Sequence, residues 1–81
     1  MQNDHEGNLL QEFQENSSER AFATLVRRYA GMVYATALRN TGSVEQAEEV
    51  TQLVFFVLAN KARGLSPRAS IGGWLHRAAV L

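Results

Sequence analysis

Two amphipathic helical patterns follow each other with almost no residues between them. In the first, apolar residues recur at the three- and four-residue intervals of one helix face; they are Phe22, Leu25, Val26, Tyr29 and Val33. Asn40, Thr41 and Gly42 then stop the helix, and Gly42 suits a left-handed C-cap. Ser43 and Gln46 form a capping box that starts the next helix at once. So short a connection predicts that the two helices pack antiparallel.

The second helix carries two distinct faces. Its apolar face should pack on the preceding helix and consists of Ala47, Val50, Val54 and Leu58. A polar stripe runs beside it and consists of Glu45, Glu48, Glu49 and Gln52. Four more apolar residues exceed what a two-helix contact can bury: Leu53, Phe55, Phe56 and Val57. We therefore expect another helix, or a partner protein, to cover part of this surface.

The segment before the long helix is predicted to be only partly ordered. Residues 1–7 show no apolar periodicity and are expected to form a disordered lead-in. Asn8 then caps an amphipathic helix of about two turns that ends near Asn16. Ser17 or Ser18 caps the long helix that follows.

The last part of the chain is predicted to be a loop and one more helix. Gly64 ends the preceding helix, and residues 65–73, which include the only proline, form the loop. Helical spacing resumes at Trp74, and no segment shows the period of two expected of half-buried strands. The predicted fold class is all-α, a small compact bundle of about three main helices plus a short N-terminal one. Residues 1–16 form the lead-in and short helix, and residues 17–81 form the helical domain.

Composition and charge exclude several classes of protein. The 81 residues hold no cysteine, which excludes a disulfide framework and favours a cytoplasmic location. The longest apolar run, residues 53–59, is far shorter than the roughly 20 residues of a membrane span. The formal charge is −4 over residues 1–20 and +4 over residues 61–81. This basic end fits either phosphate binding or an ordinary solvated surface.

Residues with catalytic chemistry are few and scattered. His5 and His76 have no partner at metal-ligand spacing, and Asp4 is the only aspartate. Glu48 and Glu49 are adjacent, so on a helix they point about 100° apart and fit a solvated face better than an acid–base pair. We therefore predict that the protein is not an enzyme and needs no metal or cofactor.

Three groups of residues occur in an order that belongs to a known family. The first is Ala21, Phe22, Leu25, Arg28, Tyr29, Val33, Tyr34 and Ala37; the second is Ala47, Glu48, Glu49, Val50, Thr51, Gln52, Val54 and Phe55; the third is Trp74, Leu75, Ala78 and Ala79. Over about residues 17–81 this order resembles region 2 of the sigma-70 family of bacterial RNA polymerase sigma factors, most closely the extracytoplasmic-function (ECF) type. The family usually has an aspartate where Glu49 stands and an acid where Leu53 stands. In the family the promoter-reading helix continues past Leu81, so we expect the domain to be truncated at its C-terminal end.

The resemblance implies a non-catalytic function in transcription initiation. Region 2 docks on the clamp coiled coil of the polymerase's largest subunit, and it recognises and melts the promoter minus-10 element by binding its non-template strand. The residues implied in polymerase binding are Glu49, Gln52, Leu53 and Phe56. Those expected to bind DNA, through phosphates or base edges, are Lys61, Arg63, Ser66, Arg68, Ser70, Trp74 and Arg77. The resemblance leaves room for an anti-sigma factor as a further partner.

Two other functions stay open at this point. A related helical module could hold a protein partner without recognising DNA, and tight clamp binding with indifference to DNA would identify it. A fragment of a remote enzyme would show reproducible turnover. Single residues have structural alternatives as well: Trp74, Leu53 and Phe56 also fit a bundle core, and Glu49 and Gln52 also fit solvated surface.

Overall fold

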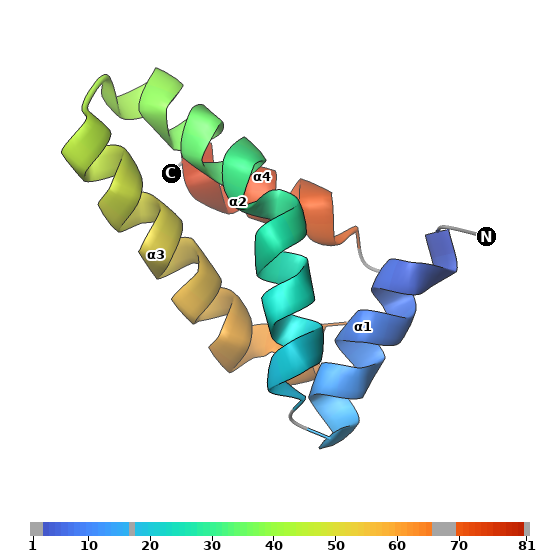
Figure 1. Ribbon diagram of the computed structural model, residues 1–81. Coiled ribbons are helices and arrows are strands. Elements are labelled where there is room, and N and C mark those ends of the chain that lie inside the picture. The colour runs from blue at the N-terminus through green and yellow to red at the C-terminus, as the bar shows by residue number, and fades with distance from the viewer. Residues whose placement is uncertain (1–2, 17, 66–69, 81) are drawn as a thin grey trace.

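The computed structural model describes residues 3–16, 18–65 and 70–80, and all regular structure within them is helical. The elements, labelled in Figure 1, are α1 (Asn3–Asn16), α2 (Glu19–Thr41), α3 (Val44–Lys61), the 3₁₀ turn η1 (Ala62–Gly64) and α4 (Ile71–Val80). The prediction of an all-α fold is confirmed.

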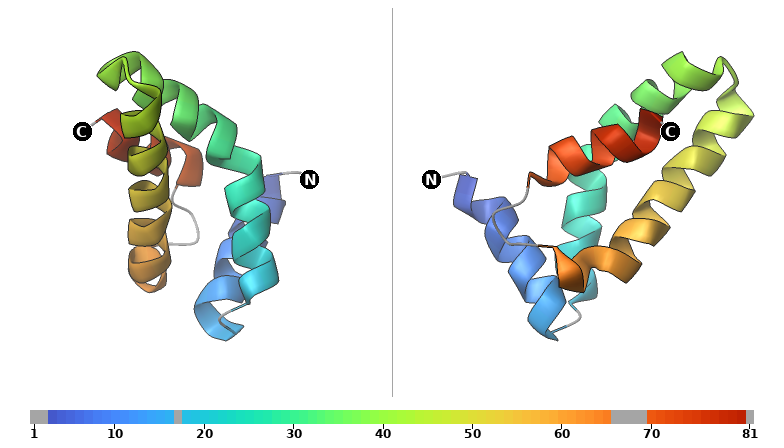
Figure 2. Two further views of the ribbon diagram at one scale, coloured as in Figure 1. Left: turned by 60° about the vertical axis from the view of Figure 1, so that its left-hand side comes forward. Right: turned by 180° about the vertical axis from the view of Figure 1, so that it is seen from behind.

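The longest helix, α2, is the centre of the arrangement and contacts the other three helices. Figure 1 shows α3 running back beside α2 in the opposite direction and α1 lying beside the N-terminal half of α2. From behind, α4 lies across the C-terminal half of α2 (Figure 2). The predicted antiparallel packing of α2 and α3 is therefore observed.

Local hydrogen bonds explain why the chain turns between α2 and α3. Gly42 adopts the left-handed conformation with φ 69°, and its amide donates to the Leu38 carbonyl at 2.8 Å. The Gln46 amide donates to Ser43 Oγ at 3.2 Å, which confirms the predicted N-cap. In a capping box the Gln46 side chain would accept from the Ser43 amide. Here that amide donates to Thr41 Oγ1 at 3.2 Å instead.

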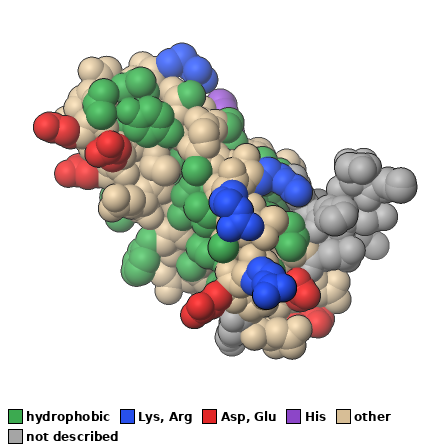
Figure 3. All heavy atoms as spheres, in the orientation of Figure 1, with side chains coloured by type: hydrophobic (Ala, Val, Ile, Leu, Met, Phe, Trp, Pro, Cys, Tyr) green, Lys and Arg blue, Asp and Glu red, His purple; other side chains and the backbone are tan. Residues whose placement is uncertain are grey.

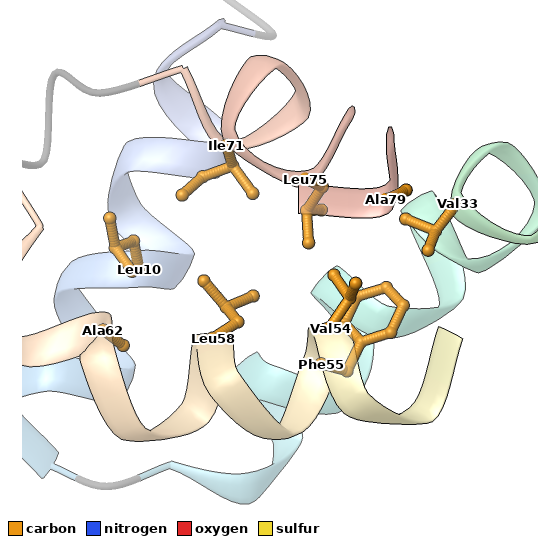
Figure 4. Close-up of a cluster of buried hydrophobic side chains, with 9 residues drawn as sticks. All are labelled: Leu10, Val33, Val54, Phe55, Leu58, Ala62, Ile71, Leu75 and Ala79. Carbon is orange, nitrogen blue, oxygen red and sulfur yellow. The ribbon is translucent and has the colours of Figure 1, made fainter. Parts of the chain in front are cut away.

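The hydrophobic core draws on all four helices (Figure 4). Its buried members are Leu10, Val33, Val54, Phe55, Leu58, Ala62, Ile71, Leu75 and Ala79. The predicted stripe of α2 faces inward: Leu25 and Val33 are fully buried, and its other three members are partly buried against the core. On α3, Ala47, Val54 and Leu58 are buried as predicted.

The prediction for the N-terminal segment is wrong over residues 3–7. The helix α1 begins at Asn3, so these residues are helical and Asn8 lies inside the helix rather than at its cap. Extending an existing helix gains one hydrogen bond for each residue that is fixed, whereas starting one is costly. Once α1 is held by the buried Leu10, turns without an apolar pattern of their own can therefore be added. Ser18 caps α2, accepting from the Ala21 amide at 3.1 Å, and Ser17 lies outside the described residues.

The predicted loop over residues 65–73 is too long at its C-terminal end. The helix α4 starts at Ile71, so Gly72 and Gly73 lie in its first turn. Ser70 acts as the cap, because its Oγ accepts from the Gly73 amide at 3.0 Å. A Cβ at Gly72 would lie only 3.3 Å from Cε1 of Tyr29, so this glycine allows α4 to approach α2 closely. At the other end, α3 stops at Lys61 and the turn η1 carries the chain to Gly64.

Candidate functional site

The exposed side of α3 gathers four residues around one shallow hollow of about 520 Å³. They are Glu49, Gln52, Leu53 and Phe56, and we call this surface the α3 face. Leu53 is 60% exposed and Phe56 is 66% exposed, which is unusual for side chains of this size. The four positions follow the i, i+3, i+4, i+7 spacing that places residues on one side of a helix. The structure therefore brings together all four residues that the sequence suggested for polymerase binding.

The surplus of apolar residues on α3 divides between the interior and the surface. Val54 and Phe55 are 5% and 7% exposed and belong to the core, which includes Leu75 and Ala79 of α4. Leu53 and Phe56 point away from it. The expectation that another helix covers part of the surplus is met by α4, and the remainder is available to a partner.

Acidic residues surround the start of the α3 face. Glu45 and Glu48 are exposed beside Glu49. In the space-filling view, acidic side chains gather at the end of the molecule where α3 begins, and basic ones lie over α2 (Figure 3). Carboxylates and an amide next to exposed apolar groups match a partner helix that carries both basic and apolar residues.

A second hollow of about 530 Å³ lies between α3 and α4. It is lined by Val50, Leu53, Val54, Val57, Trp74, Arg77 and Ala78. Leu53 lines both hollows, so they adjoin. Trp74 is partly buried and packs against the core, in agreement with the structural alternative for this residue. The sequence did not predict this hollow, because only the packing of α4 on α3 creates it.

The residues suggested for DNA binding are spread over several elements. Lys61 is exposed at the last position of α3, and Arg63 belongs to η1. Ser66 and Arg68 lie outside the described residues. Ser70 and Arg77 are both exposed. Ser70 immediately precedes α4, and Arg77 lies in its second turn.

Gly73 brings two of these residues to one place. A Cβ at Gly73 would lie 3.1 Å from Ser70 Oγ and 3.5 Å from Arg77 Nη1, so the hydroxyl and the guanidinium flank the same spot above the first turn of α4. Backbone amides at a helix N-terminus, together with a guanidinium, favour an anion. This convergence suits a phosphate of a nucleic acid strand.

The sequence did not predict one polar contact, which joins residues far apart along the chain. The side-chain amide of Gln14 in α1 donates to the backbone carbonyls of Ala62 and Leu65, the latter at 2.7 Å. Its partners lie 48 and 51 residues away, and no periodic pattern indicates such a bond.

Metal binding and membrane insertion find no support among the described residues. Within residues 3–16, 18–65 and 70–80, no group of three or more histidine, cysteine, aspartate or glutamate side chains could hold a metal ion. None of the helices in this described part is both long and apolar enough to cross a membrane.

Comparison with known protein families gives one match. The sequence model of sigma-70 region 2 matches residues 25–80, which cover most of α2 and all of α3, η1 and α4. The match takes in about two thirds of the chain and both hollows of α3, and α1 lies outside it. No curated protein and no solved structure gives a significant match.

Proposed function

The chain belongs to the sigma-70 region 2 family. We propose that its α3 face docks on the clamp coiled coil of RNA polymerase's largest subunit. We further propose that it holds the non-template strand of the promoter minus-10 element. Membership implies a sigma factor role in transcription initiation, with RNA polymerase and promoter DNA as partners. Region 2 is a non-enzymatic domain. The proposal adds the ECF type, supported by the resemblance of the ordered residue groups, and a cytoplasmic location, where polymerase and promoters are found.

The α3 face carries the docking part of the proposal. Leu53 and Phe56 offer exposed apolar area, and Glu49 and Gln52 bring hydrogen-bonding groups to the same hollow. Such an apolar anchor with a polar rim is the usual anatomy of a protein interface. An anti-sigma factor that blocked docking would have to cover the same face.

Docking is tested by titrating the chain with a peptide that forms the clamp coiled coil. We expect Glu49→Lys and Gln52→Ala to weaken binding by about tenfold or more while the helical circular dichroism signal is kept. Glu48→Lys is the matched control, since it makes the same charge change one residue away from the hollow. Equal losses from Glu48→Lys and Glu49→Lys would show that the peptide senses only the overall charge, and would refute docking at this hollow.

The exposed cations and the α4 N-terminus carry the DNA part of the proposal. Lys61 and Arg77 are exposed, and Ser70 and Arg77 flank one spot above Gly73. Single strands are held by basic groups on the phosphates and by stacking or hydrogen bonds to the bases. Four phosphate contacts, if Arg63 and Arg68 also contribute, would give a log–log salt slope of roughly −3 for a single strand.

DNA binding is tested with bacterial core polymerase loaded with the chain. The probes are a single-stranded oligonucleotide enriched from a random pool by this complex, and the complement of that oligonucleotide. We expect preference for the enriched strand and affinity that falls steeply with salt. Equal affinity for both strands would contradict the strand-binding part of the proposal.

One observation favours the alternative of a partner-binding module without DNA recognition. Ser70 Oγ already caps α4, and Trp74 already packs against the core, so two suggested DNA-binding residues have structural roles. Intact clamp binding together with indifference to DNA sequence and strand would establish this alternative.

A further inference from the structure

Gln14 joins the N-terminal helix to the end of α3. Its side-chain NH₂ group has two hydrogens, and it donates to two backbone carbonyls, those of Ala62 and Leu65. Gln14 is partly buried, so these bonds are shielded from competing water. Gln11, one turn earlier on the same helix, bonds to Glu15 within α1.

The two carbonyls belong to the place where the chain leaves α3. Ala62 O also accepts from the Leu65 amide at 3.2 Å, and Leu65 is already extended, with φ −84° and ψ 139°. Gln14 therefore bonds to both ends of the turn that η1 and Leu65 form.

Packing supports the same attachment. Leu10 lies one helical turn before Gln14 and is fully buried, next to Ala62 and close to Leu58 and Ile71 in Figure 4. Residues four apart lie on one side of a helix, so Leu10 and Gln14 meet the end of α3 together. Ile71, the first residue of α4, belongs to the same buried cluster as Leu10 and Ala62.

We propose that Gln14 is a positioning residue for promoter binding: it fixes the exit of α3 so that Lys61 and the Ser70–Arg77 spot on α4 are presented to the same DNA strand. This inference rests on the proposed function, because it assumes that these residues bind DNA. It extends that function to α1, which lies outside the residues matched by the family.

A positioning role for Gln14 can be distinguished from a role in fold stability alone. General loss of stability would weaken clamp binding and DNA binding alike. A positioning effect weakens DNA binding and leaves the α3 face intact, because that face is carried by the middle of α3.

The experiment compares Gln14→Ala and Gln14→Glu with the control Gln11→Ala. Gln14→Glu keeps the size of the side chain but presents a carboxylate to two carbonyls. Gln11 is the same residue type on the same helix, is exposed and bonds only within α1. Polymerase loaded with each variant is titrated with the enriched oligonucleotide and with a scrambled strand of equal composition, at a temperature where circular dichroism shows every variant folded.

We expect both Gln14 variants to lower the affinity for the enriched oligonucleotide by about fivefold or more, while clamp-peptide affinity stays within about twofold of the control. Amide hydrogen exchange of Leu65 should be faster by about tenfold in both variants than in Gln11→Ala.

Two results would overturn the inference. Unchanged exchange at Leu65 would show that Gln14 does not hold this turn, whatever the DNA result. Faster exchange with an unchanged affinity for the enriched oligonucleotide would show that the bond is structural only. If the unmodified chain itself shows no preference between the strands, the proposed DNA function fails and the inference fails with it. That failure is seen without any Gln14 variant, so it can be told apart from a failure of the inference alone.

Discussion

The α3 face and the basic region around α4 are built in different ways. All four members of the α3 face stand on one helix, at regular spacing, and line one hollow. The basic region consists of Lys61 at the end of α3, Ser70 at the cap of α4 and Arg77 within α4. One surface therefore depends on a single rigid element, and the other depends on how several elements are joined.

This difference predicts different sensitivities to mutation. The α3 face should keep its shape as long as α3 is helical, so its variants act mainly through lost contacts with the partner. The basic region should respond to caps and to contacts far from it, such as the Gln14 bonds to Ala62 and Leu65.

Leu58→Ala should damage both regions at once. Leu58 is fully buried in the cluster that joins α3 to α1 and α4. Removing it leaves a cavity and should lower the free energy of unfolding by about 2–5 kcal/mol. Chemical denaturation measures this change, and Phe56→Ala, at an exposed site of the same helix, should change it by only about 0.5 kcal/mol. Similar losses in the two variants would contradict the division of α3 into a buried and an exposed face.

Phe56→Ala should act on the α3 face alone. Because the ring is an exposed apolar anchor at the hollow, clamp-peptide affinity should fall by roughly tenfold, or about 1.4 kcal/mol. Fluorescence anisotropy measures the affinity. Val44→Ala is the control, since Val44 is also an exposed apolar residue of α3 but does not line the hollow. An equal loss from Val44→Ala would move the interface toward the start of the helix.

Ser70 variants should separate structure from DNA binding in the basic region. Ser70→Ala removes the cap of α4 and should cost about 1 kcal/mol of stability. Ser70→Asp can still cap, and a negative charge is favourable at a helix N-terminus, so stability should be kept. The same charge should repel a phosphate near Arg77 and weaken DNA binding by loaded polymerase. Undiminished DNA binding by Ser70→Asp would remove this spot from the DNA path.

Lys61→Ala should have the smallest effect, a change in salt dependence. Removing one phosphate contact on a single strand should make the log–log slope less negative by about 0.7, with little change in stability. Titrations of loaded polymerase at several salt concentrations measure the slope. Arg39→Ala, at the exposed C-terminal turn of α2, should leave the slope unchanged. Equal changes in both variants would point to a general charge effect rather than a contact at Lys61.

Features that depend on neighbouring residues could be predicted from the sequence, whereas features that depend on contacts between elements could not. The stripes of α2 and α3 and the turn at Gly42 and Ser43 were predicted correctly, because they depend on spacing and on caps within a few residues. The starts of α1 and α4 were placed too late. Helix extension toward Asn3, and the tolerance of Gly72 and Gly73 in the first turn of α4, depend on packing against other elements.

By itself, the sequence determined that this chain is helical, that α2 and α3 pack antiparallel, and that Glu49, Gln52, Leu53 and Phe56 share one side of a helix. These are consequences of the 3.6-residue period and of short-range hydrogen bonds. Packing between the helices determines that Phe55 is buried in the core while Phe56 stays exposed, and that Gln14 bonds to carbonyls 48 and 51 residues away. The physical reason is that burial and long-range hydrogen bonds depend on which neighbour covers a given helix face, and periodicity within one segment carries no information about that neighbour.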